Sequence, residues 1–134
     1  QPGFGTKLLP NVESLKKKDY TLKMQGNEVF KVAVRSMAEI AQTSLKENDM
    51  SVEDVDLFIP HQANIRILNA AAKRIGLKDE QVYINVDRYG NTSGATIPLA
   101  MDEANRAGLI KEGDILLLDA FGGGFTWAAA LLRW

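Results

Sequence analysis

Two loops carry the residues of this 134-residue chain whose types and spacing could do chemistry. The first, residues 60–64, holds His61, the only histidine, directly after the apolar run 55–59. The second, residues 89–93, holds Asn91 after the strand-like run 82–86. An imidazole and a carboxamide can both donate hydrogen bonds to an oxygen that gains negative charge. The chain contains no cysteine, so this pair has no thiol nucleophile beside it.

A glycine-rich turn at 122–124 adds backbone N–H groups to this set. The three features together suit the stabilisation of an enolate or oxyanion. His61 lies shortly before a predicted helix, whose positive end disfavours imidazolium, so we expect a neutral imidazole. Each feature alone also fits a structural role: a loop histidine, an asparagine in a left-handed turn, and a tight hairpin. Their convergence at strand ends favours a site.

The elements that must position these loops follow from hydrophobic spacing. Apolar residues three and four apart predict helices over 27–48, with Asn27 as N-cap, over 65–75, ended by Gly76, and over 97–107, before Gly108. Apolar runs predict four strands, at 55–59, 82–86, 114–119 and 126–132. Residues 1–25 read as an irregular lead-in with one possible short strand at 20–24 and a solvated lysine run at 16–18.

The order of these elements predicts an α/β fold. Strands separated by helices imply a mostly parallel sheet covered by helices, and the last strand, which follows a tight turn, returns antiparallel. Ligands bind beyond the carboxyl ends of strands in such sheets. His61, Asn91 and the glycine turn are all expected at such ends.

Composition limits the classes of function. We expect one domain over 1–134, because the length and the 46% hydrophobic content suit a single core. The net charge of −1 gives no field favouring nucleic acid or an anionic membrane. The apolar runs are too short to span a bilayer, and no signal peptide is visible, so a cytoplasmic location is expected. One histidine and no cysteine exclude a histidine-rich or thiolate metal centre.

Four motifs, taken together with their order and spacing along the chain, match one known family. They are the segments PHQANIR at 60–66, YGNTSGA at 89–95, AFGGGFTW at 120–127 and GNEVFK at 26–31. Together they resemble the C-terminal half of β-ketoacyl-acyl carrier protein synthase III over nearly the whole chain. The resemblance implies a thiolase-like fold of two similar halves, usually in a homodimer. It also implies a decarboxylating Claisen condensation of acyl-CoA, often acetyl-CoA, with malonyl-acyl carrier protein, which initiates fatty acid synthesis without a metal or cofactor.

The resemblance also implies roles for particular residues. His61 and Asn91 would hydrogen-bond the malonyl thioester oxygen, and the N–H of Gly123 would help to form the oxyanion hole for acyl transfer. The entry for the pantetheine arm would be lined by Gly26, Asn27, Phe30, Ala63 and Asn64. A basic patch for the acidic acyl carrier protein would be formed by Lys31, Arg66, Lys73 and Arg74. Arg66 and Lys73 share a helix stripe independently of the family, although ordinary solvated charges would give the same pattern.

The chain also departs from the family. The nucleophilic cysteine and the N-terminal half that carries it are absent, and the opening strand of the C-terminal half is expected to be missing too. We therefore expect a fragment that is inactive alone and has the N-terminal half of the same enzyme as its partner. Two alternatives stay open: a non-catalytic module that binds acyl carrier protein or CoA, and a malonyl decarboxylase that needs no cysteine.

Overall fold

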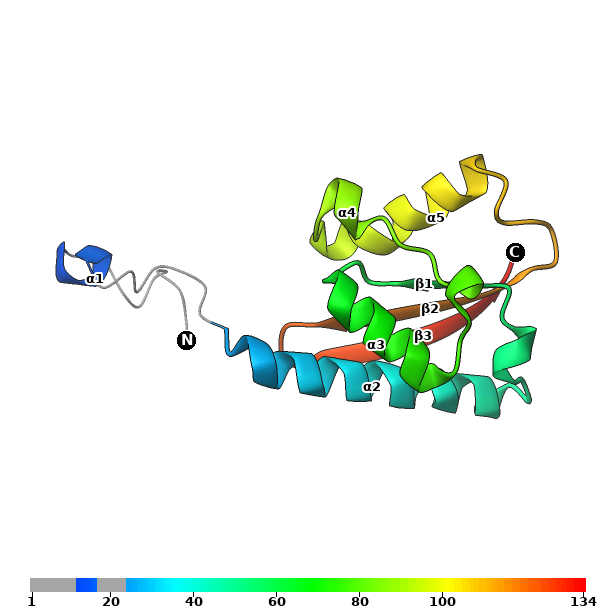
Figure 1. Cartoon of the computed structure of the whole chain (residues 1–134), viewed down its shortest axis with the longest axis horizontal. Coiled ribbons are helices and arrows are strands. Elements are labelled where there is room, and N and C mark those ends of the chain that lie inside the picture. Colours follow the sequence, from blue (N-terminus) through cyan, green and yellow to red (C-terminus); the bar gives the residue numbers. More distant parts are fainter. Residues whose placement is uncertain (1–11, 17–23) are drawn as a thin grey trace.

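A computed structural model describes residues 12–16 and 24–134 of the chain (Figure 1). The strand predicted at 20–24 lies, apart from Met24, outside these residues. The lead-in predicted to be irregular contains a short helix, α1 (Val12–Lys16). The remaining helices are α2 (Gly26–Glu47), α3 (Ile65–Ile75), α4 (Val86–Tyr89) and α5 (Thr96–Arg106), with single 3-10 turns at Val52–Asp54, Asp79–Gln81 and Ser93–Ala95.

Three strands form one sheet in the order β1 (Leu57–Pro60), β2 (Ile115–Gly122), β3 (Thr126–Arg133). β1 and β2 are parallel, with Pro60 opposite Asp119. β2 and β3 are antiparallel, with Gly122 opposite Thr126 across the glycine turn. The predicted α/β class and the antiparallel return of the last strand are therefore confirmed.

Helices cover both faces of the sheet (Figure 1). On one face, α2 and α3 pack on Phe58 and Leu117 in a core that includes Ala41, Leu45 and Ile75. On the other face, α5 packs through Ala100 and Ala104 on Leu57, Ile59 and Leu116. Successive residues of β1 and β2 alternate between these two clusters, as the pleat of a strand requires. β1 and the first residues of β2 are buried on both sides, which explains their continuous apolar sequence.

The helix ends agree with the sequence except at one cap. α3 ends at Gly76, whose φ of 102° is a left-handed value that glycine adopts without strain. At its start the Asn64 side chain accepts a hydrogen bond from the Arg66 N–H at 2.9 Å. The predicted N-cap of α2 was wrong: Gln25 occupies that position, without a side-chain hydrogen bond, and Asn27 lies inside the first turn.

The strand predicted at 82–86 is also wrong. Only Val82 forms a parallel bridge, to Phe58 of β1. Beyond it the side-chain carbonyl of Gln62 accepts hydrogen bonds from the N–H groups of Asn85 and Val86, at 2.9 and 3.1 Å. These N–H groups are consequently not available to a neighbouring strand, and the chain turns into α4. Tyr83 and Asn85 are buried and Val82, Ile84 and Val86 are half-buried, but a side chain replaces the ladder.

β3 is an edge strand within the described residues, since it pairs only with β2. It carries exposed Trp127 and Leu132, followed by exposed Trp134. No helix in the described ranges is long and apolar enough to cross a membrane.

Candidate active site

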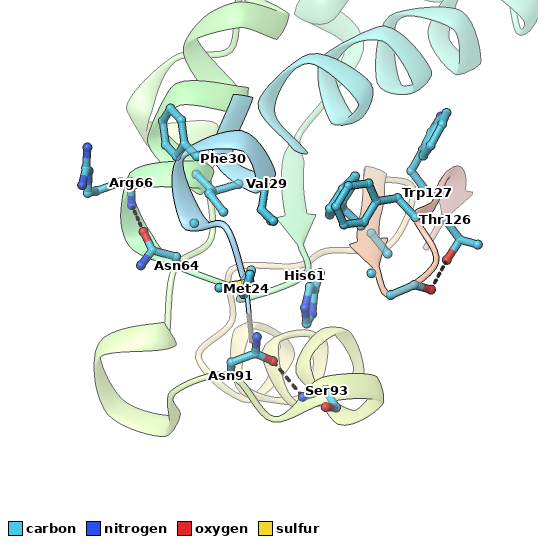
Figure 2. A pocket seen from close by; sticks show the side chains of 18 of the residues that line it. Met24, Val29, Phe30, His61, Asn64, Arg66, Asn91, Ser93, Thr126 and Trp127 are labelled. Atoms are coloured by element: carbon cyan, nitrogen blue, oxygen red, sulfur yellow. Dashed lines mark hydrogen bonds between the residues drawn. The ribbon is translucent and has the colours of Figure 1, made fainter. Parts of the chain in front are cut away.

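An open cavity of about 1080 Å³ lies where β1 and β2 end, under the first turns of α2 and α3 (Figure 2). It contains nine of the residues singled out from the sequence: Gly26, Asn27, Phe30, His61, Ala63, Asn64, Arg66, Asn91 and Gly123. Four segments far apart in the chain therefore meet at one place. In the described part of the chain no three His, Asp or Glu side chains are grouped as a metal site would require.

His61 is held by its neighbours on two sides. Its backbone N–H donates to the Asp119 carbonyl at 2.7 Å, which continues the β1–β2 pairing. Its ring Nδ1 lies 2.6 Å from Oγ1 of Thr96, the first residue of α5. Burial lowers the pKa of His61 below its usual 6.5. The ring is thus neutral at pH 7, as expected, although the main cause is burial rather than the helix end, and Nε2 remains for a ligand.

Asn91 is held by a local turn. Its side-chain oxygen accepts a hydrogen bond from the Ser93 N–H at 3.0 Å (Figure 2). Ser93 has a left-handed φ of 54°, and Gly90, which directly precedes Asn91, has a φ of 66°. With the oxygen engaged in this turn, the Asn91 NH₂ group is the part of the carboxamide that can donate to a ligand.

Gln62 joins the His61 loop to the segment 83–86 that leads into α4, a role that sequence reasoning missed. Its NH₂ group donates to the carbonyls of Pro60 and Tyr83, at 2.9 and 3.1 Å. Its oxygen accepts from the backbone of Asn85 and Val86, as described above. The side chain is 1% exposed, so all four hydrogen bonds are shielded from water. The position beside His61 gave no signal because Tyr83, Asn85 and Val86 lie more than twenty residues away.

A second group of polar side chains attaches the segment before Asn91 to α5. Glu103 of α5 accepts hydrogen bonds from the Asn85 side chain and from Arg88, both at 2.9 Å. These contacts lower the pKa of Glu103, the hydrogen bond from Asn85 being the largest cause. The start of α4 is thereby attached to the same helix whose first residue contacts His61.

The glycine turn forms the opposite wall of the cavity. Gly123 is exposed there, between the ends of β2 and β3. Phe121 stacks on Trp127, with ring centroids 6.5 Å apart, and lies 5.0 Å from Phe125. The aromatic rings give this wall an apolar surface, which the sequence analysis did not assign.

The predicted basic patch is divided in the structure. Arg66 lies at the mouth of the cavity, with its guanidinium 5.5 Å from the centre of the Phe30 ring. Lys31, one residue further on in α2, is exposed and pairs with Glu28 at 3.0 Å. Lys73 and Arg74 lie in the last turn of α3, about 10 Å along the helix from Arg66. They do not line the cavity that contains His61.

Known proteins are similar to this chain over most of its length. Residues 45–134 match the family described as 3-oxoacyl-[acyl-carrier-protein (ACP)] synthase III C terminal. The β-ketoacyl-[acyl-carrier-protein] synthase III of Campylobacter fetus is 51% identical over 98% of this chain. That of Desulfitobacterium hafniense is 49% identical over 99%. The chain spans about 40% of the length of each of these curated relatives.

Solved structures give the same result. The synthase III crystal structure from Thermus thermophilus superposes with a TM-score of 0.83 and 55% identity, and covers 86% of this chain and 36% of that one. The Aquifex aeolicus enzyme gives a TM-score of 0.82 and 50% identity, over 84% and 36%. The predicted thiolase-like fold is thus confirmed for the described part. The chain belongs to the family of 3-oxoacyl-[acyl-carrier-protein] synthase III C-terminal domains.

Proposed function

We propose that this chain supplies the condensation donors of a β-ketoacyl-acyl carrier protein synthase III. The proposed reaction is the decarboxylative Claisen condensation of acyl-CoA, such as acetyl-CoA, with malonyl-acyl carrier protein, which starts fatty acid synthesis. One observation carries the proposal. His61 and Asn91 line the same cavity, and each has one polar atom engaged by the protein and a second one left for a ligand.

The chemistry follows from these free atoms. When the malonyl group loses carbon dioxide, the electrons of the broken C–C bond form an enolate on the thioester oxygen. His61 Nε2–H and the Asn91 NH₂ group donate to that oxygen and stabilise its charge. The enolate carbon then attacks an acyl-cysteine thioester, and the tetrahedral intermediate expels the thiolate. The cysteine would come from the remaining part of the enzyme, and the Gly123 N–H would stabilise the oxyanion formed in acyl transfer.

The same proposal includes partners. The pantetheine arm would enter past Phe30 and Asn64, and an acidic acyl carrier protein would dock near Arg66, with Lys31, Lys73 and Arg74 extending the basic surface along α2 and α3. Docking of this kind should weaken with salt. The N-terminal half of the enzyme and a second copy complete the proposed assembly, which would work in the cytoplasm without a metal or cofactor.

The experiment separates the two half-reactions in the complete enzyme. His61→Ala or Asn91→Ala should lower the condensation rate by about 10²–10³-fold while acyl loading from labelled acetyl-CoA is unchanged. Equal loss of both steps would contradict the roles proposed here. The chain alone should neither condense nor release carbon dioxide from malonyl-acyl carrier protein. Release of carbon dioxide would identify a decarboxylase, and binding without turnover a carrier-protein module.

A further inference from the structure

We infer that Thr96 is a positioning residue that fixes the tautomer of His61, and the inference rests on the proposed function only for its kinetic consequence. The Thr96 hydroxyl donates its proton to Nδ1, so that the ring proton stays on Nε2 and faces the cavity. The contact joins Oγ1 of a threonine that is 3% exposed to Nδ1 at 2.6 Å. A hydroxyl can donate or accept in such a contact, so the direction must be argued from its surroundings.

The first argument is the hydroxyl's own proton. A buried O–H needs an acceptor, and the only hydrogen bond of the Thr96 side chain within the described residues is the one to His61. A threonine in a helix can instead donate to the carbonyl four residues earlier, as Thr43 does to Glu39 at 2.8 Å. Thr96 makes no such bond. Nδ1 is therefore the acceptor, and it must carry a lone pair.

The second argument is the charge of the ring. Burial favours the neutral imidazole, which holds one proton on one of its two nitrogens. With Nδ1 accepting from Thr96, that proton is on Nε2. A carboxylate or a backbone carbonyl at the same place would accept from Nδ1 and leave Nε2 without a proton. The hydroxyl thus favours the one tautomer that can donate to an enolate oxygen.

The single histidine makes a direct test possible. In the chain labelled with ¹⁵N-histidine, NMR at pH 7.5 should show one imidazole with its proton on Nε2. A proton on Nδ1 in the unsubstituted chain would overturn the inference without any variant. Thr96→Ser should leave the spectrum unchanged, whereas Thr96→Val, which keeps the shape but lacks the hydroxyl, should give a mixture of tautomers. An unchanged tautomer in a folded Thr96→Val chain would also overturn it.

Kinetics then connect the tautomer with the reaction. In the complete enzyme Thr96→Val should lower the condensation rate about tenfold with acyl loading unchanged. Thr96→Ser should have the condensation rate of the unsubstituted enzyme. Failure of the two proposals can be distinguished. If NMR shows the Nε2 proton but His61→Ala still condenses, the proposed function is wrong and the tautomer assignment holds. If His61→Ala is inactive and NMR shows the proton on Nδ1, only the assignment fails.

Discussion

The His61 and Asn91 loops present similar hydrogen-bond donors but are held in different ways. His61 is half-buried and is fixed by residues distant in sequence, Asp119 through its backbone and Thr96 through its side chain. Asn91 is exposed and is fixed by a turn to Ser93, two residues away. A group that can ionise and rotate needs tertiary contacts to hold one state. A carboxamide cannot titrate, so a local turn that engages its oxygen is enough.

The largest effect is expected when the hydrogen-bond donor at Asn91 is changed while its turn is kept. Asn91→Asp keeps an oxygen for the Ser93 N–H but replaces the NH₂ group by a negatively charged oxygen. We expect the condensation rate of the complete enzyme to fall by about 10³-fold, because the carboxylate repels the enolate and donates nothing. Stopped-flow or discontinuous assays of condensation, with acyl loading as the internal control, measure this.

Asn91→Ala is the matched variant, since it removes the turn and the donor together. If Asn91→Asp retained a rate within tenfold of the unsubstituted enzyme, donation by the NH₂ group would be excluded.

The anchoring of the His61 loop is tested by Gln62→Met. The methionine fills a similar volume but leaves the two backbone carbonyls and two backbone N–H groups that Gln62 now satisfies without their partner. We expect the free energy of unfolding to fall by about 3 kcal/mol, measured by urea denaturation followed by circular dichroism.

Gln42→Met is its control, because Gln42 is exposed and makes one side-chain hydrogen bond, to the Arg74 carbonyl at 3.3 Å. That variant should lose no more than about 0.5 kcal/mol. Equal losses in the two variants would show that the buried amide has no special part in joining the His61 loop to the segment 83–86.

A smaller effect is expected in the pH dependence of stability, and it arises at the residue that anchors the His61 loop. Asp119, which anchors the His61 backbone, is 1% exposed, and its carboxylate oxygens have no hydrogen-bond partner among the described residues. Burial raises its pKa to about 8. Between its ordinary pKa of 3.8 and 8 the folded chain therefore holds a proton that the unfolded chain has lost, so stability falls as the pH rises and levels off above 8.

The test compares unfolding of the chain with that of Asp119→Asn. The difference in unfolding free energy between the two should change by about 1.4 kcal/mol per pH unit between pH 5 and 7, in favour of the variant at higher pH. Taking the difference removes the contribution of His61, whose lowered pKa acts in the opposite direction. A difference that is independent of pH would show that Asp119 is ionised in the folded chain.

The sequence predicted the elements well where local signals decide them. Gly76 ended α3 as expected, and the three long helices have their predicted extents to within one or two residues. The strand at 82–86 was wrong because the side chain of Gln62, more than twenty residues away, takes the backbone N–H groups that would continue a ladder. No local pattern contains such a contact.

The candidate site shows the same difference between local signals, which can be predicted, and contacts between distant residues, which cannot. The positions of His61 and Gly123 at the ends of strands could be expected from the order of strands and helices. Asn91 was expected at the end of the strand 82–86 but instead follows α4, and the structure still lines one cavity with all three residues. Their catalytic roles stay predictions. Thr96 and Gln62 were missed because each acts through a contact that exists only in the folded chain. A hydroxyl residue directly before the predicted helix 97–107, and three residues after Ser93, is the signal in the sequence that would have drawn attention to Thr96.

One strand sets the spacing between the two proposed reaction centres. β2 pairs Asp119 with Pro60, just before His61, and reaches the glycine turn three residues later at Gly122. Because side chains alternate along a strand, one residue inserted between Asp119 and Gly122 would turn the following positions to the opposite face and displace the turn by about 3.3 Å. This segment has therefore a fixed length in any working variant, whereas loops elsewhere can be lengthened. His61 and Gly123, the residues proposed to serve the enolate and the oxyanion, can therefore not be moved apart along β2.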